Sequence, residues 1–234
     1  MFPDVEVARM DADTVSATNT HEAILSRFRR GEQRILLGTQ MVAKGLDLPN
    51  VTLVGVLDAD LSLFTGGFRA GETTFDMLTQ VVGRAGRGDY EGRAVIQTMA
   101  PNHELIRLAA EQDYGRFYDL EIRLRQVQHA PPFADQVLIA FQGLQESQVL
   151  LGAAKFRGSL LSLGKRGALG GYELLGPAPS PVPKINYQYR YRLTLRCRLD
   201  KNIRASLAYL LSAFGKDKTM RGVSAYMDVN GFEG

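Results

Sequence analysis

The sequence has little cysteine and no long apolar run, and each shortage excludes a class of protein. Cys197 is the single cysteine in 234 residues, so the chain can form neither an internal disulfide framework nor a cysteine-based zinc site. No run of about 18 apolar residues occurs, and none predicts a membrane span. The start of the sequence lacks the basic and apolar regions of a secretory signal. We therefore expect a protein of the reducing cytoplasm.

The sequence also lacks a phosphate-cradling loop of the form GxxxxGK[ST], which an ATPase needs. The nearest match, at residues 158–167, has five residues between its glycines and carries Arg166 after the lysine. It also falls within or after a predicted helix, so we reject it. The apolar segment 51–60 imitates a Walker B strand with Asp58 and Asp60. Without a phosphate loop, we interpret these aspartates as strand-end residues, and a role in coupling is the alternative.

Charge is distributed unevenly along the chain. The sequence is 45% hydrophobic and 23% charged, as in globular proteins. Residues 1–130 hold 14 Lys and Arg against 18 Asp and Glu, whereas residues 131–234 hold 14 against 7. This asymmetry indicates a nucleic acid or another anionic partner for the second half, with a basic surface kept for solubility as the alternative. The three histidines are scattered without metal-ligand spacing, so no metal site is predicted.

Residues 1–129 alternate between strand-like and helix-like segments, which predicts an α/β domain with a parallel sheet and helices on its faces. The expected strands cover 5–10, 34–39, 51–60 and 94–99; the expected helices cover 20–30, a stretch from about residue 72, and 102–128 with a break at Gly115. The near-continuous apolar run 51–60 predicts a strand buried on both faces.

Two prolines in "HAPPFADQ", residues 129–136, mark a domain boundary. We expect a second domain over 130–234. Its strands are predicted at 136–142, 172–176, 187–198 and 223–229, its helices at 147–163 and 202–214, and a proline-rich bend at 177–184. This βαββαβ order favours an α+β fold of the ferredoxin-like, split βαβ type.

The stretch "LTQVVGRAGRGDY", residues 78–90, sets two arginines among three glycines. In a helix, Gln80, Arg84 and Arg87 share one face, and Leu78 lies on the opposite one. Guanidinium groups are permanently charged and match phosphate oxygens with paired donors. We interpret the stretch as an anion site whose glycines clear space for phosphates; the alternative is a glycine-rich helix end with solvated arginines.

A second stretch, "GTQMVAKGLDLPNV" at residues 38–51, follows an apolar strand. Thr39 lies at the strand end, where open α/β sheets bind ligands, and offers a hydroxyl to a phosphate. Gly45 permits a tight turn, and Asp47 can accept hydrogen bonds from a ribose. The alternative is an ordinary connection with Lys44 in solvent.

Together, "GTQMVAKGLDLP" and "QVVGRAGR" resemble the fifth and sixth motifs of superfamily-two helicases. The intervening "NVTLVGVLDADLSL" and "FRAGETTFDMLTQ" resemble specifically the replication-restart, or primosomal, helicases. The resemblance covers essentially the whole chain. It implies a second RecA-like lobe followed by a C-terminal domain that begins near "HAPPF".

The resemblance also implies roles for individual residues. Arg84 and Arg87 match arginines that reach the γ-phosphate of ATP held by the other lobe, and Gln80 belongs to the same motif. Thr39 matches a position that contacts the DNA backbone. Asp47 matches a position that couples nucleotide binding to DNA binding, and Lys44 and Gly45 lie in the same loop. ATP and Mg²⁺ are expected only with the first lobe, and the zinc of the family has no ligands in this chain. We expect a C-terminal fragment that is inactive as an ATPase by itself.

The segment "YQYRYRLTLRCR", residues 187–198, alternates aromatic or apolar with basic residues. Because side chains on a strand alternate with a period of two, one face should pack into a core. That face carries Tyr187, Tyr189, Tyr191, Leu193, Leu195 and Cys197. The opposite face carries Arg190, Arg192, Arg196 and Arg198, spaced by about 6.6–6.8 Å per two residues. We interpret it as a phosphate track, with a solvated strand face as the alternative.

The resemblance implies forked or branched DNA as the partner, together with single-strand DNA-binding protein and primosome proteins. A stand-alone, non-enzymatic nucleic-acid-binding module is the alternative, but it leaves "QVVGRAGR" unexplained. A phosphometabolite enzyme is a third reading, although no general base accompanies the arginines in the sequence.

Overall fold

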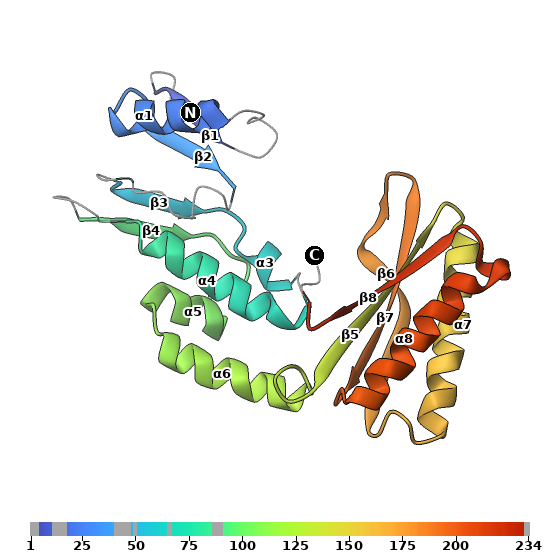
Figure 1. Cartoon of the computed structure of the whole chain (residues 1–234). Helices are drawn as coiled ribbons and strands as arrows, with labels where there is room; N and C mark the ends of the chain where they lie inside the picture. The colour runs from blue at the N-terminus through green and yellow to red at the C-terminus, as the bar shows by residue number, and fades with distance from the viewer. Residues whose placement is uncertain are drawn as a thin grey trace. The chain divides into compact units, whose positions relative to one another are not determined.

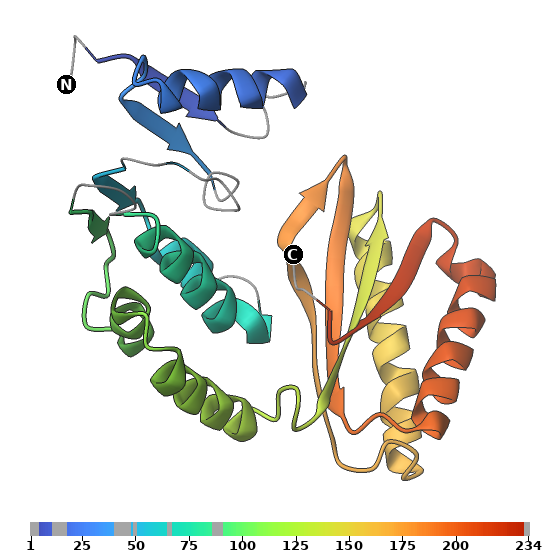
Figure 2. The same ribbon diagram turned by 60° about the vertical axis from the view of Figure 1, so that its left-hand side comes forward.

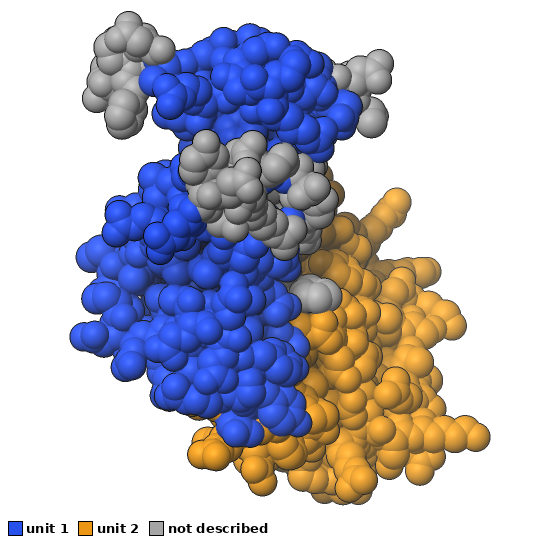
Figure 3. All heavy atoms as spheres, turned by 90° about the vertical axis from the view of Figure 1, so that its left-hand side faces the viewer, with its two compact units in different colours: residues 1–64, 70–119 blue, residues 65–69, 120–234 orange. Residues whose placement is uncertain are grey.

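A computed structural model describes residues 5–10, 18–39, 48, 51–64, 67–85 and 91–231 of the chain (Figure 1). The chain divides into two compact units, which Figure 3 colours separately. Unit 1 comprises Met1–Phe64 and Ala70–Asp119, and unit 2 comprises Thr65–Arg69 and Leu120–Gly234. The division falls inside a helix, α6 (Tyr114–Val127).

Unit 1 contains two strand–helix–strand segments. Its elements are β1 (Val7–Met10), α1 (Thr18–Arg29), β2 (Ile35–Gly38), β3 (Leu53–Val56), α3 (Asp60–Phe64), α4 (Ala70–Val82), β4 (Arg93–Ile96), α5 (Glu104–Glu111) and the start of α6. β1 pairs with β2 and β3 with β4, and both pairs are parallel, as predicted. Among the described residues, however, they form two separate two-stranded sheets rather than one. The prediction of a single sheet is therefore not met in this part of the chain.

The prediction that residues 51–60 form one strand buried on both faces is wrong. β3 has only four residues, and its burial alternates, with Leu53 and Gly55 exposed and Val54 and Val56 half-buried. α4 contacts β3 and β4, so one face of the pair is covered. The chain then leaves the sheet, so Leu57 and Ala59 lie in the connection between β3 and α3.

The helical stretch 102–128 is broken before Gly115, not at it. α5 ends at Glu111. The next residue, Gln112, has a left-handed φ of 56° and donates its backbone N–H to the carbonyl oxygen of Ala109, which caps the helix. Asp113 then accepts a hydrogen bond from the backbone N–H of Arg116 at 3.0 Å, as a residue at a helix start does. Gly115 lies inside α6, so the polar residues at the break, and not the glycine, separate the two helices.

Unit 2 is built around a four-stranded antiparallel sheet. After η1 (Gly67–Arg69) and the end of α6, its elements are β5 (Asp135–Gly143), α7 (Glu146–Lys165), β6 (Tyr172–Ile185), β7 (Gln188–Cys197), α8 (Lys201–Lys216), η2 (Lys218–Met220) and β8 (Val223–Val229). The strand order is β6-β7-β5-β8. Both helices lie on the same side of the sheet, as Figure 1 and Figure 2 show.

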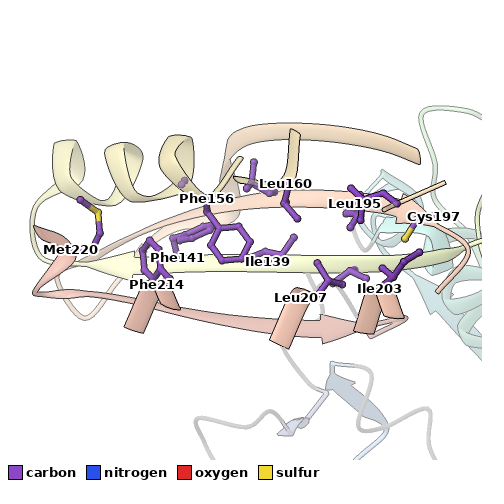
Figure 4. Packing of buried hydrophobic residues seen from close by; sticks show 14 of the residues in the cluster. Ile139, Phe141, Phe156, Leu160, Leu195, Cys197, Ile203, Leu207, Phe214 and Met220 are labelled. Carbon is purple, nitrogen blue, oxygen red and sulfur yellow. The ribbon is translucent and has the colours of Figure 1, made fainter. Parts of the chain in front are cut away.

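The core of unit 2 lies between these helices and the sheet (Figure 4). Phe141 of β5 meets Phe156 of α7 and Phe214 of α8 in edge-on contacts, each with ring centroids 5.6 Å apart. Leu195 and Cys197 of β7 complete the cluster from the next strand. Burial of such side chains stabilises a domain by about 1.5–3 kcal/mol each, so this cluster is the main source of stability of unit 2.

The proline-rich segment 177–184 was predicted as a bend, but it is part of β6. The strand runs from Tyr172 to Ile185 with register shifts between Leu175 and Ala178 and between Pro179 and Lys184. β6 is an edge strand, and proline is tolerated at an edge or a bulge because its missing N–H needs no partner there.

Candidate nucleic-acid interface and nucleotide-facing motifs

The C-terminal end of α4 carries the described part of the Arg-Gly stretch. α4 ends at Val82, and the chain continues in tighter turns, with the backbone N–H of Arg84 bonded to the carbonyl oxygen of Val81 at 3.0 Å. Leu78 is fully buried, as predicted, whereas Gln80 is exposed. Arg84 is half-buried. Arg87 lies outside the described residues, so its position relative to Arg84 stays a prediction.

Gly83 has a packing reason for being a glycine. A Cβ at this position would lie 3.2 Å from the carbonyl oxygen of Thr79 and 3.4 Å from the side-chain nitrogen of Gln112. The first distance is tighter than most side chains accept, whereas the second is an ordinary contact with the end of a flexible side chain. The end of α4 thus approaches the α5–α6 junction, and packing inside unit 1 already favours a small residue here.

The loop after β2 is described only at its start. Thr39 follows the last residue of β2 and is exposed, at the carboxyl end of a parallel strand. Lys44, Gly45 and Asp47 lie outside the described residues. The expected ribose and DNA contacts of this loop therefore remain predictions.

Asp60 has a structural role at the end of the β3 segment. Its carboxylate accepts hydrogen bonds from the hydroxyl of Thr98 and from the backbone N–H of Met99, both at 2.7 Å. The bond from Met99, followed by that from Thr98, lowers the pKa of Asp60. These contacts tie the segments after β3 and β4 together, in agreement with the interpretation of Asp60 as a strand-end residue.

The two faces of β7 have the predicted character over the second half of the strand. Leu193, Leu195 and Cys197 are buried in the core beneath α7 and α8. The alternate residues face the other side of the sheet, where Arg192 stands opposite Ala140 of β5 and Arg196 opposite Gln136. The helices therefore do not cover the arginine-bearing face, although Ala140 and Gln136 on it are buried and Arg192 is half-buried.

The prediction that the tyrosine face of 187–191 belongs to the core is wrong for two of its three residues. Tyr187 is 83% exposed. Tyr189 is half-buried outside the core cluster and carries the Lys184 ammonium 4.4 Å from its ring centre. Tyr191 packs against the core and donates a hydrogen bond to Glu146 at 2.8 Å, and this bond raises its pKa.

Arg196 is held by neighbouring side chains. Its guanidinium lies 3.0 Å from a carboxylate oxygen of Glu173 on β6 and donates to the backbone oxygen of Gln128 at 3.2 Å and to the amide oxygen of Gln136 at 3.4 Å. The segment 187–198 itself contains no carboxylate. Register with β6 supplies one from outside the segment, so part of the charge of Arg196 is neutralised.

The other basic residues differ in their surroundings. Arg190 is half-buried opposite Gln142 of β5, and Arg198 is exposed just beyond the end of β7. Asp228 of β8 pairs in register with Leu138, the neighbour of Thr194, and is the second carboxylate on this face. Sequence reasoning missed Glu173, Gln136 and Asp228 because their place beside β7 follows from long-range register alone.

No helix in the described residues has the length and apolar character that crossing a membrane requires. No group of three or more His, Cys, Asp or Glu side chains in the same residues is arranged to hold a metal ion.

Comparisons with known proteins match both halves of the chain. Residues 3–89 match the family sequence model for the helicase conserved C-terminal domain, which implies a RecA-like α/β fold for that region. Residues 126–231 match the primosomal protein N C-terminal domain. The two matched ranges do not overlap and together cover most of the chain.

Three curated relatives with significant similarity to the chain are replication restart proteins PriA. The replication restart protein PriA of Bacillus subtilis is 38% identical over 230 residues, which are 98% of this chain and 28% of the relative. Those of Synechocystis and Haemophilus influenzae are 39% and 36% identical, and each alignment covers 76% of this chain and 21% or 24% of the relative. The chain thus spans less than a third of the length of these relatives. Aligned over almost its whole length with one of them and matched in tandem by two C-terminal domain models, the chain belongs to the PriA family of replication restart proteins.

Proposed function

We propose that the chain is the second RecA-like lobe and the DNA-binding unit of an ATP-dependent replication restart helicase of the bacterial cytoplasm. The lobe comprises residues 1–129, and the C-terminal domain comprises residues 130–234 with a ferredoxin-like fold. The element order βαββαβ and the strand order β6-β7-β5-β8, in which each helix connects two strands separated by a third, support this fold.

The first lobe of the helicase binds ATP and Mg²⁺, and this chain supplies the residues that respond to it. Arg84 and Arg87 stabilise the charge on the departing phosphoryl group, and Gln80 assists from the same motif. Thr39 and Lys44 contact the DNA backbone, while Gly45 and Asp47 connect the DNA-contacting loop to the nucleotide. The tandem of helicase and primosomal domain matches supports these assignments.

This division of labour predicts that the chain alone hydrolyses no ATP at a meaningful rate, with or without DNA, because it has no phosphate loop. In a full-length relative carrying this region, Arg87→Ala should lower turnover by about 10³–10⁵ and leave nucleotide and DNA binding intact. The measurement is steady-state ATP hydrolysis beside equilibrium binding of both ligands. DNA-stimulated hydrolysis by the purified chain, surviving Arg84→Ala and Arg87→Ala, would refute the assignment.

DNA binding by unit 2 rests on one observation, the arginine-bearing face of β7 that α7 and α8 leave uncovered. Arginines along a strand match successive phosphates without reading sequence. Forked DNA should bind with a strong salt dependence, and each lost phosphate contact should reduce the slope of log affinity against log salt by about 0.7–0.9. Single-strand DNA-binding protein and primosome proteins are the expected protein partners of the assembled helicase.

The test is a salt titration of fluorescent forked DNA against the chain and its variants. Arg190→Ala with Arg198→Ala should flatten the slope by about twice the single-contact value. Arg196→Ala should have a smaller effect, because Glu173 already offsets its charge. Lys165→Ala with Arg166→Ala, which removes two exposed cations at the end of α7, is the control with the same change in net charge. Equal slopes for the double variant and this control would show that the β7 face is merely solvated.

A further inference from the structure

The β6–β7 hairpin closes in a tight two-residue turn beyond the rest of the sheet. Lys184 pairs with Tyr189 and Ile185 with Gln188, which leaves Asn186 and Tyr187 as the turn. β5 ends in register with Tyr189, so the residues past this pair have no strand beside them except each other. The hairpin is the orange pair of strands in Figure 1 and Figure 2.

The turn has the backbone geometry of a type I′ turn, with φ of 48° at Asn186 and 63° at Tyr187. Asparagine is favoured at the first position, and glycine at the second. A tyrosine at the second position is costly, because a side chain with a Cβ crowds its own backbone when φ is positive. Glycine would occupy the position without this strain.

The folded chain gains little from the strained tyrosine. Its side chain is 83% exposed, and within the described residues no hydrogen bond, ion pair or ring contact involves it. A bulky residue that costs stability in the turn and makes no contact in return points to a ligand outside the chain.

The neighbours of Tyr187 fit a ligand that combines flat rings with negative charge. The Lys184 ammonium lies over the Tyr189 ring at 4.4 Å and 3.3 Å from its hydroxyl oxygen, so this cation is held at the hairpin. Arg190 follows on β7 at the start of the arginine-bearing face. The tip also exposes Val182 and Ile185, which are 49% and 44% exposed. Nucleic acid offers aromatic base faces beside phosphates, and an aromatic side chain stacks on any base.

We propose that the tip of the β6–β7 hairpin binds an unpaired nucleobase by stacking on Tyr187, with Lys184 contacting an adjoining phosphate and the arginine-bearing face contacting phosphates further along. The inference rests on the proposed DNA-binding function and adds to it a recognition of single-stranded or unpaired positions. An unpaired base is needed because a base inside a duplex already stacks on both faces. The arginine-bearing face then binds backbone of any kind, and the hairpin distinguishes a fork from a plain duplex.

The chain has no tryptophan, which allows a direct test. Tyr187→Trp creates a single reporter, and stacking on a base should quench most of its fluorescence when oligo-dT or forked DNA is added to the full chain. Tyr209→Trp, at an exposed position on α8, is the matched control and should change little. Equal quenching at both positions, or none at position 187 while DNA is bound, overturns the proposal.

A second variant separates stacking from folding. Tyr187→Gly should raise the melting temperature, since it relieves the turn, while it weakens binding of oligo-dT and forked DNA by about fivefold to 100-fold, the range of one base–aromatic contact. It should leave blunt duplex binding and the salt slope unchanged. A lower melting temperature would assign Tyr187 a structural role, and unaltered affinity for oligo-dT and forked DNA would exclude stacking; either result overturns the proposal.

The two proposals fail in different ways. If the wild-type chain binds no DNA of any kind at low salt, the proposed function is wrong. If it binds DNA through the arginine-bearing face, with the expected loss on Arg190→Ala and Arg198→Ala, but Tyr187→Gly behaves like wild type on oligo-dT and forked DNA, the hairpin inference alone is wrong.

Discussion

The two units bury their apolar residues in different ways. In unit 2, four strands and two helices enclose a single cluster in which Val137, Ile139 and Phe141 of the same strand are fully buried. In unit 1, the buried members of the cluster around β1 and α1 among the described residues are Met10, Leu25 and Leu48. The helices of unit 1 pack more closely than its strands, and the ring centroids of Phe75 and Phe117 lie 4.0 Å apart. Several apolar side chains of its strands remain exposed to solvent.

The difference follows from the kind of sheet. An antiparallel sheet is stable with one face covered, whereas a parallel sheet is normally covered on both faces. Two helices on one side are therefore sufficient for unit 2. The strands of unit 1 are parallel, and Leu53 of β3 and Val95 of β4 are still 63% and 58% exposed. The free energy of unfolding of unit 2 should thus depend strongly on individual core side chains. The free energy of unfolding of unit 1 should depend little on exposed strand residues such as Leu53 and Val95.

The largest contrast is expected between two leucines on strands. Leu195→Ala removes a fully buried side chain from the core of unit 2 and should cost about 2–5 kcal/mol of its free energy of unfolding. Leu53→Ala removes a side chain that is mostly in solvent and should change stability by less than about 0.5 kcal/mol. Urea unfolding, with hydrogen exchange assigning each transition to a unit, measures both values.

Equal losses in the two variants would break the comparison. A large cost for Leu53→Ala would mean that the exposed face of β3 is covered in solution. Leu175→Ala is a useful control within unit 2, because this leucine is 44% exposed on β6 and should also cost little.

A smaller contrast is expected between two strand glycines. A Cβ at Gly143 of β5 would lie 2.6 Å from the carbonyl oxygen of Gly222 and 3.1 Å from a methyl carbon of Val149. Gly143→Ala must therefore shift the backbone and should cost about 1–3 kcal/mol. At Gly55 of β3 a Cβ meets nothing within 4 Å, and Gly55→Ala should stabilise by about 0.4–1 kcal/mol through the unfolded chain.

Thermal unfolding of the two glycine variants measures these changes. If Gly143→Ala is tolerated as well as Gly55→Ala, the close approach of β5 to Gly222 is absent in solution, and the tight packing assigned to unit 2 is overstated.

Sequence patterns predicted those features of the fold that depend on neighbouring residues. The period of two in β7 correctly assigned Leu193, Leu195 and Cys197 to the core. It failed at Tyr187, which lies past the end of β5, and at Tyr189, which pairs with the last residue of β5, because the core does not extend that far along the hairpin. The alternation of side chains along one strand does not indicate where the neighbouring strand ends.

Features that depend on distant residues were not predictable from these patterns. The pairing of Arg196 with Glu173 follows from the register of β6 with β7, and the strand character of the proline-rich segment follows from its place at the sheet edge. Of the residues predicted to contact nucleotide or DNA, Gln80, Arg84 and Thr39 lie within the described chain. The roles of all these residues stay predictions that rest on the motif resemblance.

The stability of unit 2 should fall in acid because of Asp217, and this response should differ from that of unit 1. Its carboxylate accepts hydrogen bonds from Lys155 and Thr219, and these bonds lower its pKa to about 2 from an ordinary value of 3.8. A pKa lowered by folding contributes stability that is fully present above the ordinary value and is lost as the pH falls towards about 2. Asp217→Asn should therefore destabilise unit 2 at pH 6, and the gap from wild type should close between pH 4 and pH 2. If the stability difference between wild type and Asp217→Asn stays constant over this range, the loss comes from altered hydrogen-bond geometry at the amide and not from the lost charge.

The smallest effect, of opposite sign, is expected from Asp76 on α4 of unit 1. Burial, and then the nearby charge of Glu72, raise the pKa of this carboxyl above its ordinary value. A group that binds its proton more tightly in the folded chain makes folding less favourable as the pH rises through its pKa. Asp76→Asn removes this charge and should slightly stabilise unit 1 at pH 7, with no difference from wild type near pH 3, where both side chains are neutral. The measurement is the midpoint of urea unfolding of unit 1 at the two pH values, with Asp119→Asn on α6 as the control. Destabilisation by Asp76→Asn at pH 7 would show that the ionised carboxylate makes a favourable contact in unit 1, and the two units would then respond to acid in the same direction.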